Sequence, residues 1–282
     1  MKHRLIPLLV VLALTVILGT SAVAAGRKPA ATGLLPDLRT VVPTHLQLVN
    51  EHQRETLRFS NGIANTGPGP WALRPDPSIE FARENNLSKV SAVQEIRDSG
   101  AYYACTPEPP KQVTECYNVV SSSVAGTFDF HPAHNHWHIS DVALFEVRRG
   151  SPTGPVVNNA SIKTTFCLID WYKLDDNAPT AERVFFDCYS SFQGISSGWV
   201  DQYHQSTSGQ QLDLTGVPNG DDYYLVSTAN HEGIFAESDK TNNTAWVKFS
   251  LTSDSKGNRK VTVTAHSDCD TPGLCGEHST NR

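Results

Sequence analysis

Short apolar segments separated by turn-forming residues fill the chain from Leu35 onward, and this pattern restricts the fold more than any other feature. The segments are rich in Val, Thr, Phe and Tyr, and clusters of Gly, Pro, Asn and Asp lie between them, as is typical of β-strands joined by turns. Strands are expected at 57–65, 142–147, 162–168, 184–188, 223–227, 246–251 and 261–265, and residues 88–96 could form a short helix. The sequence therefore predicts an all-β, mainly antiparallel protein: a β-sandwich core with long decorating loops and little helix.

The first 25 residues are typical of a secretory signal peptide. Two basic residues precede an apolar run at 5–25, which ends near the small-residue cleavage site Ala22-Val23-Ala24. An uncleaved membrane anchor is the alternative, because the run is nearly long enough to span a bilayer. The small residues favour cleavage. We therefore expect a secreted, extracellular protein with no stable membrane span after cleavage.

Three regions are expected after the signal peptide. Residues 26–34 are expected to form a short, flexible lead-in rich in small residues. Residues 35–252 are expected to form one large domain, and residues 253–282 a polar C-terminal extension with an edge strand and a small disulfide loop. Within the large domain, polar connections at 170–183 and 189–211 are longer than a minimal sandwich needs. Long loops in a compact domain tend to be functional or mobile.

All six cysteines lie beyond the signal peptide, and an even number in an exported protein indicates disulfide bonds. Sequence order suggests the pairs Cys105–Cys116, Cys167–Cys188 and Cys269–Cys275, although six cysteines allow about fifteen pairings. None of the spacings is the C-x-x-C of a thiolate zinc site.

The chain carries more acidic than basic residues. Without the signal peptide it has 21 basic and 29 acidic residues, a formal net charge of −8. No basic patch interleaves with aromatic residues, which argues against a nucleic-acid partner. An acidic surface weakly favours cationic ligands, although solubility alone explains it.

Three histidines, His134, His136 and His138, alternate with single residues. In an extended strand such side chains share one face, so the three imidazoles can bind one metal ion. Three histidines with an open fourth position suit a reactive metal, and the spacing alone does not separate copper from zinc. His131 lies outside the alternating set, so we expect it to support the site or the fold and not to bind the ion.

Three further segments carry chemistry: 163–170, 194–203 with its continuation at 211–214, and 237–243. Together with the histidines, and in this order, they resemble the lysyl oxidase family of copper amine oxidases over roughly residues 35–251. The resemblance makes 35–252 a lysyl oxidase-like catalytic domain. It implies that the three histidines bind copper (Cu²⁺) and that Lys163 and Tyr203 form a lysine tyrosylquinone.

The resemblance also implies the reaction. Primary amines, with peptidyl lysine among the candidates, would be deaminated oxidatively to aldehydes, and dioxygen would be reduced with release of hydrogen peroxide and ammonia. The chain departs from animal members at Ala133, Trp199 and Gly209, where they have cysteines, and at His204, where glycine is usual. These departures indicate a microbial-type member.

The reaction needs a base that removes a proton from the carbon beside the amine nitrogen, and this base must lie within hydrogen-bond reach of that proton. Asp201, two residues before Tyr203, is one candidate, and Asp141 and Asp170 are others. Outside the family context, Lys163 would be a solvated lysine and Tyr203 a half-buried loop aromatic.

Two other functions remain open at this point. The chain could be a non-catalytic β-sandwich module that binds copper at a cell surface, which would need only the histidines. It could also be a zinc hydrolase, although the sequence offers no convincing set of a base and oxyanion donors.

Overall fold

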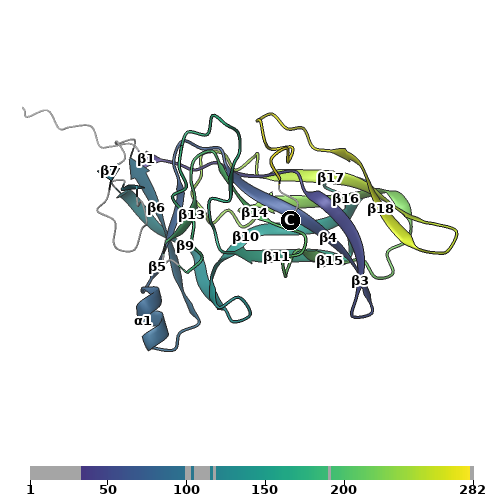
Figure 1. Cartoon of the computed structure of the whole chain (residues 1–282), viewed down its shortest axis with the longest axis horizontal. Helices are drawn as coiled ribbons and strands as arrows, with labels where there is room; N and C mark the ends of the chain where they lie inside the picture. Colours follow the sequence, from purple (N-terminus) through teal and green to yellow (C-terminus); the bar gives the residue numbers. More distant parts are fainter. Residues whose placement is uncertain (1–32, 99–102, 105–114, 117–118, 190–191, 280–282) are drawn as a thin grey trace, which may run out of the picture. The chain divides into compact units, whose positions relative to one another are not determined.

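The computed structural model describes residues 33–98, 103–104, 115–116, 119–189 and 192–279 (Figure 1). The expected signal peptide lies outside the described residues and stays a prediction. Of the expected lead-in, Gly33–Leu34 is described and forms the short strand β1. In the part of the chain that is described, no helix is both long and apolar enough to cross a membrane.

Most described strands form a large antiparallel sheet. Its order is β13 (Gln193–Ile195), β5 (Trp71–Asp76), β6 (Lys89–Asp98), β9 (Val119–His131), β10 (His136–Arg149), β16 (Gly220–Ala229), β17 (Thr244–Ser253) and β18 (Arg259–His266). In addition, β1 pairs with β6, and β11 (Val156–Phe166) pairs with β10. Strand β10 thus pairs with β9 near its start and with β11 and β16 further along.

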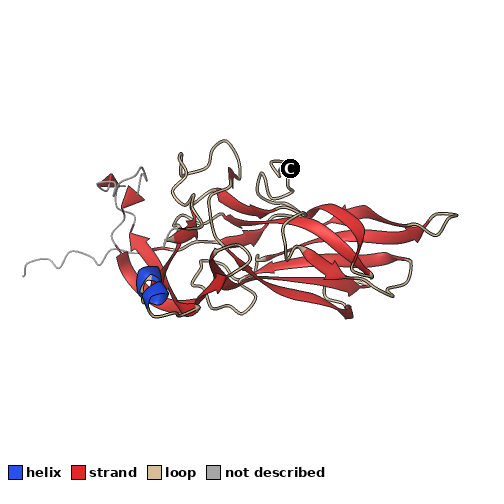
Figure 2. Cartoon of the chain, turned by 60° about the horizontal axis from the view of Figure 1, so that its bottom comes forward, coloured by secondary structure: helices blue, strands red, loops and turns tan. Residues whose placement is uncertain are grey.

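A smaller antiparallel sheet is centred on β4. It has the order β12 (Tyr172–Lys173), β14 (Trp199–Tyr203), β4 (Arg54–Asn65) and β15 (Gln211–Asp213), and β2 (Leu38–Thr40) and β3 (Thr44–Glu51) also pair with β4. Strands β7 (Tyr103–Ala104) and β8 (Glu115–Cys116) form a separate pair. Strands dominate the described structure (Figure 2).

The core lies where the apolar faces of the two sheets meet. Strand β17 shows the principle, since Ala245, Val247 and Phe249 are buried while the residues between them are partly exposed. Across the sheets, the ring of Phe59 in β4 packs edge-to-face on Phe145 in β10, with centroids 4.9 Å apart. Each buried phenylalanine stabilises the fold by about 1.5–3 kcal/mol. The predicted β-sandwich core is therefore confirmed.

Most of the expected strands are confirmed, and two expectations are wrong. Residues 88–96 are not a helix, because β6 covers nearly all of them and pairs with β5 and β9. The helix of the described residues is α1 (Ile79–Glu84), which begins at Ser78, whose hydroxyl accepts a hydrogen bond from the Phe81 N–H at 3.2 Å.

Residues 184–188 are not a strand either. The N–H groups of Val184 and Phe185 donate to the carboxylate of Asp170, at 2.8 and 3.1 Å, and are therefore not available for a β-ladder. The expected connection at 189–211 contains β13 and β14, so part of it belongs to the sheets.

Two expected disulfides are confirmed. Cys167–Cys188 closes the connection that includes 170–183, and Cys269–Cys275 closes a loop after edge strand β18. The expected Cys105–Cys116 pair stays a prediction, because Cys105 lies outside the described residues.

Candidate metal centre and its cavity

The three histidines come from the hairpin that joins β9 and β10. His136 and His138 are the first and third residues of β10, whereas His134 lies in the turn 132–135. The turn closes because the N–H groups of His134 and Asn135 both donate to the carbonyl oxygen of His131, at 3.1 and 2.9 Å. Asn135 has a φ of 56°, a left-handed conformation that asparagine tolerates. The expectation of one extended strand is therefore right for His136 and His138 and wrong for His134.

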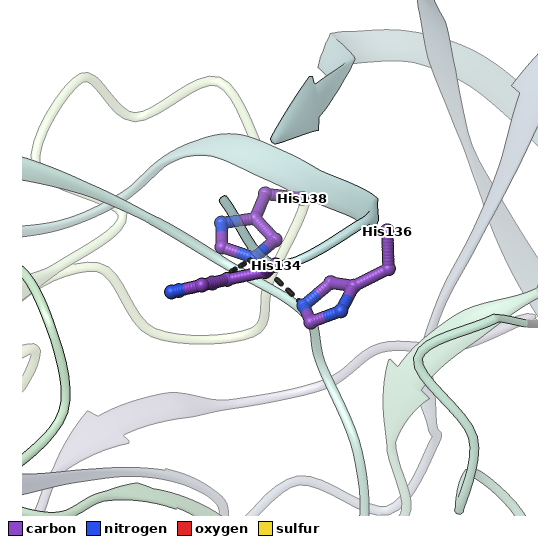
Figure 3. Close-up of side chains that lie close together, drawn as sticks. All are labelled: His134, His136 and His138. Carbon is purple, nitrogen blue, oxygen red and sulfur yellow. Dashed lines mark hydrogen bonds between the residues drawn. The ribbon is translucent and has the colours of Figure 1, made fainter. Parts of the chain in front are cut away.

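The three imidazole rings converge nonetheless (Figure 3). Nε2 of His138 lies 2.9 Å from Nε2 of His136 and 3.3 Å from Nδ1 of His134. An ion bound to imidazole at about 2.0–2.1 Å holds neighbouring ligand nitrogens about 2.9–3.4 Å apart. These spacings fit a single ion with three nitrogen ligands.

The surroundings keep the three rings neutral. Burial lowers the pKa of His134, of His136 and most strongly of His138, where it falls from 6.5 to about 3, and the neighbouring histidines lower it further. A nearby carboxylate, Asp187, partly offsets this effect at His136. Neutral imidazole is the form that binds metal ions. The cluster is therefore ready to bind an ion at neutral pH.

Two further side chains orient the histidines. The Thr165 hydroxyl lies 3.2 Å from Nδ1 of His138, so a proton on Nδ1 leaves Nε2 free as a ligand. The ring of His131 stacks on those of His134 and His138, with centroids 4.3 and 4.8 Å apart. Sequence patterns did not indicate Thr165, apart from its place two residues after Lys163.

Tyr203, at the end of β14, lines the same cavity as the three histidines, which has a volume of about 290 Å³. Its hydroxyl donates to the Cys167 carbonyl oxygen at 2.9 Å and accepts from the Cys167 N–H at 2.7 Å. Its ring stacks on Phe166 at 3.9 Å. Burial, and then the carboxylate of Asp201, raise the pKa of Tyr203 well above 10, so the phenol stays protonated.

The three candidate bases lie in different places. Asp201 is buried in the wall of the histidine cavity. Asp170 is also buried, and its carboxylate accepts hydrogen bonds from the backbone of Val184, Phe185 and Ser196, which gives it a structural role. Asp141 lines a separate cavity. Geometry therefore favours Asp201.

The environment of Asp201 is unusual for a carboxylate. It accepts a hydrogen bond from the Ile169 N–H, while its Oδ2 has no partner among the described residues. Burial, and then the charge of Asp170, raise its pKa well above 3.8. A carboxyl group with a raised pKa next to a cavity is suited to proton transfer.

Lys163 is described only in its backbone, which pairs with Leu144 where β11 joins β10. Its side chain lies outside the described residues. Sequence reasoning also missed Tyr189, whose ring packs edge-on against His136 with centroids 5.8 Å apart.

Comparison with known proteins agrees with these features. The family model for lysyl oxidase matches residues 112–261. Lysyl oxidase homolog 1 of Homo sapiens is 32% identical over 117 residues, 42% of this chain and 19% of that protein. Protein-lysine 6-oxidase of Sus scrofa is 23% identical over 197 residues, 66% of this chain and 75% of that protein. The match thus spans about a fifth of the human relative and three quarters of the porcine one.

Proposed function

Since the chain belongs to the lysyl oxidase family, we propose that it is a secreted copper-dependent amine oxidase. It would deaminate primary amines, with peptidyl lysine as the leading candidate, to aldehydes and release hydrogen peroxide and ammonia. The observation that carries the proposal is that Tyr203 and the three histidines line one cavity.

His134, His136 and His138 would hold the copper ion, supported by Thr165 and His131. Their nitrogen spacing and neutral state fit a divalent ion that prefers imidazole. Lys163 and Tyr203 would be the precursors of a lysine tyrosylquinone. Together, copper and this quinone supply redox chemistry that transfers electrons from the amine to dioxygen.

The backbone supports the pairing of Lys163 with this site. Position 163 lies on β11 two residues before Thr165, and positions two apart in a strand share a face. Thr165 contacts His138, so this face of β11 is directed toward the metal centre.

We assign proton abstraction from the carbon beside the amine nitrogen to Asp201. It lines the cavity next to Tyr203, and its Oδ2 is unpaired within the described residues. Because burial disfavours its charged form, a proton gained there is held more strongly than on an exposed aspartate. The two hydrogen bonds between the Tyr203 hydroxyl and the backbone of Cys167 hold the phenol in place.

The test is peptide mapping by mass spectrometry on aerobically copper-loaded protein, with an unloaded control. We expect a covalent link between the Lys163 and Tyr203 peptides only after copper loading, together with peroxide release from a primary amine. Lys163→Arg and Tyr203→Phe should each abolish both signals and still bind copper.

The alternatives give different results. Free peptides at full copper occupancy, without peroxide release, would leave a copper-binding module as the better account. Activity that depends on zinc and is indifferent to removal of oxygen would instead identify a hydrolase.

A further inference from the structure

The disulfide Cys167–Cys188 forms part of the wall of the cavity that contains the three histidines. Both sulfur atoms and one ring nitrogen of His136 lie within 4.8 Å of one another. Cys188 and His136 are partly exposed, so ions in solution can reach them, whereas Cys167 is buried. Two thiolates and an imidazole are a common ligand set for zinc and other ions that prefer sulfur.

We propose that reduction of this disulfide creates a second metal site, formed by Cys167, Cys188 and His136, which takes His136 away from the three-histidine set. The intact disulfide thus reserves His136 for the ion bound by histidines. The consequence for copper loading rests on the proposed function, whereas the thiolate site itself does not.

The positions of the Cα atoms permit this site. Zinc–thiolate bonds of about 2.3 Å at tetrahedral angles hold two sulfurs about 3.8 Å apart. The Cα atoms of Cys167 and Cys188 are 5.5 Å apart, so rotation of the two side chains can provide that separation. An ion at this position would keep a fourth place for water.

The three ligands differ in how firmly they are held. His136 is fixed by β10, and the backbone of Cys167 is fixed by its two hydrogen bonds with Tyr203. Cys188 lies in a turn outside the sheets, so it can adjust to an ion. The next residue of that turn, Tyr189, already packs on His136. The turn is therefore held in place by the contact of Tyr189 with His136, while the Cys188 side chain can still adjust to an ion.

A similar group elsewhere requires a control. His266, Cys269 and Cys275 also place their ligand atoms within 4.8 Å of one another, but none of them lines the histidine cavity. Among the described residues, a fully reduced chain would therefore have two such groups of two cysteines and one histidine. Replacing Cys105, Cys116, Cys269 and Cys275 with serine leaves Cys167 and Cys188 as its cysteines, and we call this chain the two-cysteine variant.

The experiment uses Cd²⁺ alone as the probe, under anaerobic conditions, and follows ultraviolet cadmium–thiolate absorption. A phosphine reduces the disulfide: the S–S bond breaks, phosphorus takes the oxygen of one water molecule and is oxidised, and the two protons of that water end on the two thiols. Each thiol releases its proton when it binds cadmium. The oxidised chain should give no thiolate band.

In the reduced two-cysteine variant we expect one cadmium ion per chain with a thiolate band. Added His136→Ala should weaken cadmium binding at least tenfold, while added His134→Ala should leave the band and the affinity unchanged. Equal effects of the two substitutions, or two cadmium ions bound at once, would overturn the proposal.

A second comparison avoids dependence on the folding of the two-cysteine variant. In the otherwise unchanged full-length chain, Cys167→Ser/Cys188→Ser should remove the His136-sensitive part of the cadmium band after reduction, whereas Cys269→Ser/Cys275→Ser should retain it. An undiminished His136-sensitive band in the first variant contradicts the site. Neither readout uses amine oxidation, so these results separate failure of this proposal from failure of the oxidase proposal.

Discussion

The hydroxyl of Tyr203 is held by both backbone polar groups of one residue, Cys167: it accepts from the N–H at 2.7 Å and donates to the carbonyl oxygen at 2.9 Å. These bonds join the end of β14 to the residue that follows β11. Cys167 is also half of the disulfide beside His136, so this one residue contacts both the phenol of Tyr203 and the surroundings of the metal centre. Substitutions of residues near Cys167 should show which side chains serve metal binding, which serve catalysis and which serve stability.

Thr165→Val should weaken metal binding by the histidines about 10–100-fold, because it removes the partner of Nδ1 on His138. The measurement is competitive titration with Cu²⁺ or Zn²⁺. Thr164→Val is the matched control, since the Thr164 hydroxyl donates to the Ala143 carbonyl oxygen and contacts no histidine nitrogen in the described structure. Equal losses in the two variants would contradict the role of Thr165.

Asp201→Asn should lower kcat for amine oxidation about 10²–10⁴-fold, the usual contribution of a positioned base. Copper binding and the thermal midpoint should change little, because burial already favours the neutral form of this side chain. The pH dependence of kcat provides the second readout: its acidic limb should disappear in the variant. Full activity in Asp201→Asn would remove this residue from the mechanism.

Asp170→Asn should act on stability. The carboxylate of Asp170 accepts hydrogen bonds from the Val184, Phe185 and Ser196 backbones on its two oxygens, and an amide would replace one of these oxygens with an NH2 group that cannot accept. We expect the free energy of unfolding to fall by about 2–4 kcal/mol, as measured by urea denaturation. A selective loss of kcat with unchanged stability would instead make Asp170 part of the catalytic machinery.

The metal-free chain should lose stability in acid partly through His138. Its pKa is 6.5 when exposed and about 3 in the folded chain, so the folded state binds fewer protons within this window. The contribution to the free energy of unfolding is complete above pH 6.5 and is lost as the pH falls toward 3. His138→Gln should make the free energy of unfolding, measured by chemical denaturation, depend less on pH between these two limits. An unchanged slope would show that His138 does not titrate as its burial requires.

Strands in which apolar and polar residues clearly alternate were predicted correctly from the sequence. The prediction failed where the apolar spacing also fits a helix, and where a side chain accepts the hydrogen bonds that a neighbouring strand would otherwise accept. Within 88–96, apolar residues at Val90, Val93 and Ile96 match a helical spacing as well as a buried strand. At 184–188 the composition suits a strand, but a carboxylate 14 residues earlier takes the backbone N–H groups of Val184 and Phe185. A local pattern contains no information about such a distant partner.

The candidate site was predictable where its members are close in sequence. The spacing of the histidines indicated a common metal ion, although a turn and not a strand brings His134 to the others. The approach of Tyr203 to this cluster depends on the pairing of β14 with β4, which no local pattern reveals. Its placement followed from resemblance to a family, and the hydrogen bonds between its hydroxyl and the backbone of Cys167 became visible only in the structure.

The turn 132–135 determines which residues of β10 oppose β9, since His136 pairs with His131 and His138 with Asp129. Deleting or inserting one residue there would shift the register of the hairpin by one residue. The imidazoles of His136 and His138 would then both move to the other face of the sheet. The loop 150–155 at the other end of β10 leads into β11, so its length acts on the site through the position of Thr165 beside His138 and not through the pairing of β10 with β9. The number of residues in the turn 132–135 is thus as much a requirement for metal binding as the histidines themselves.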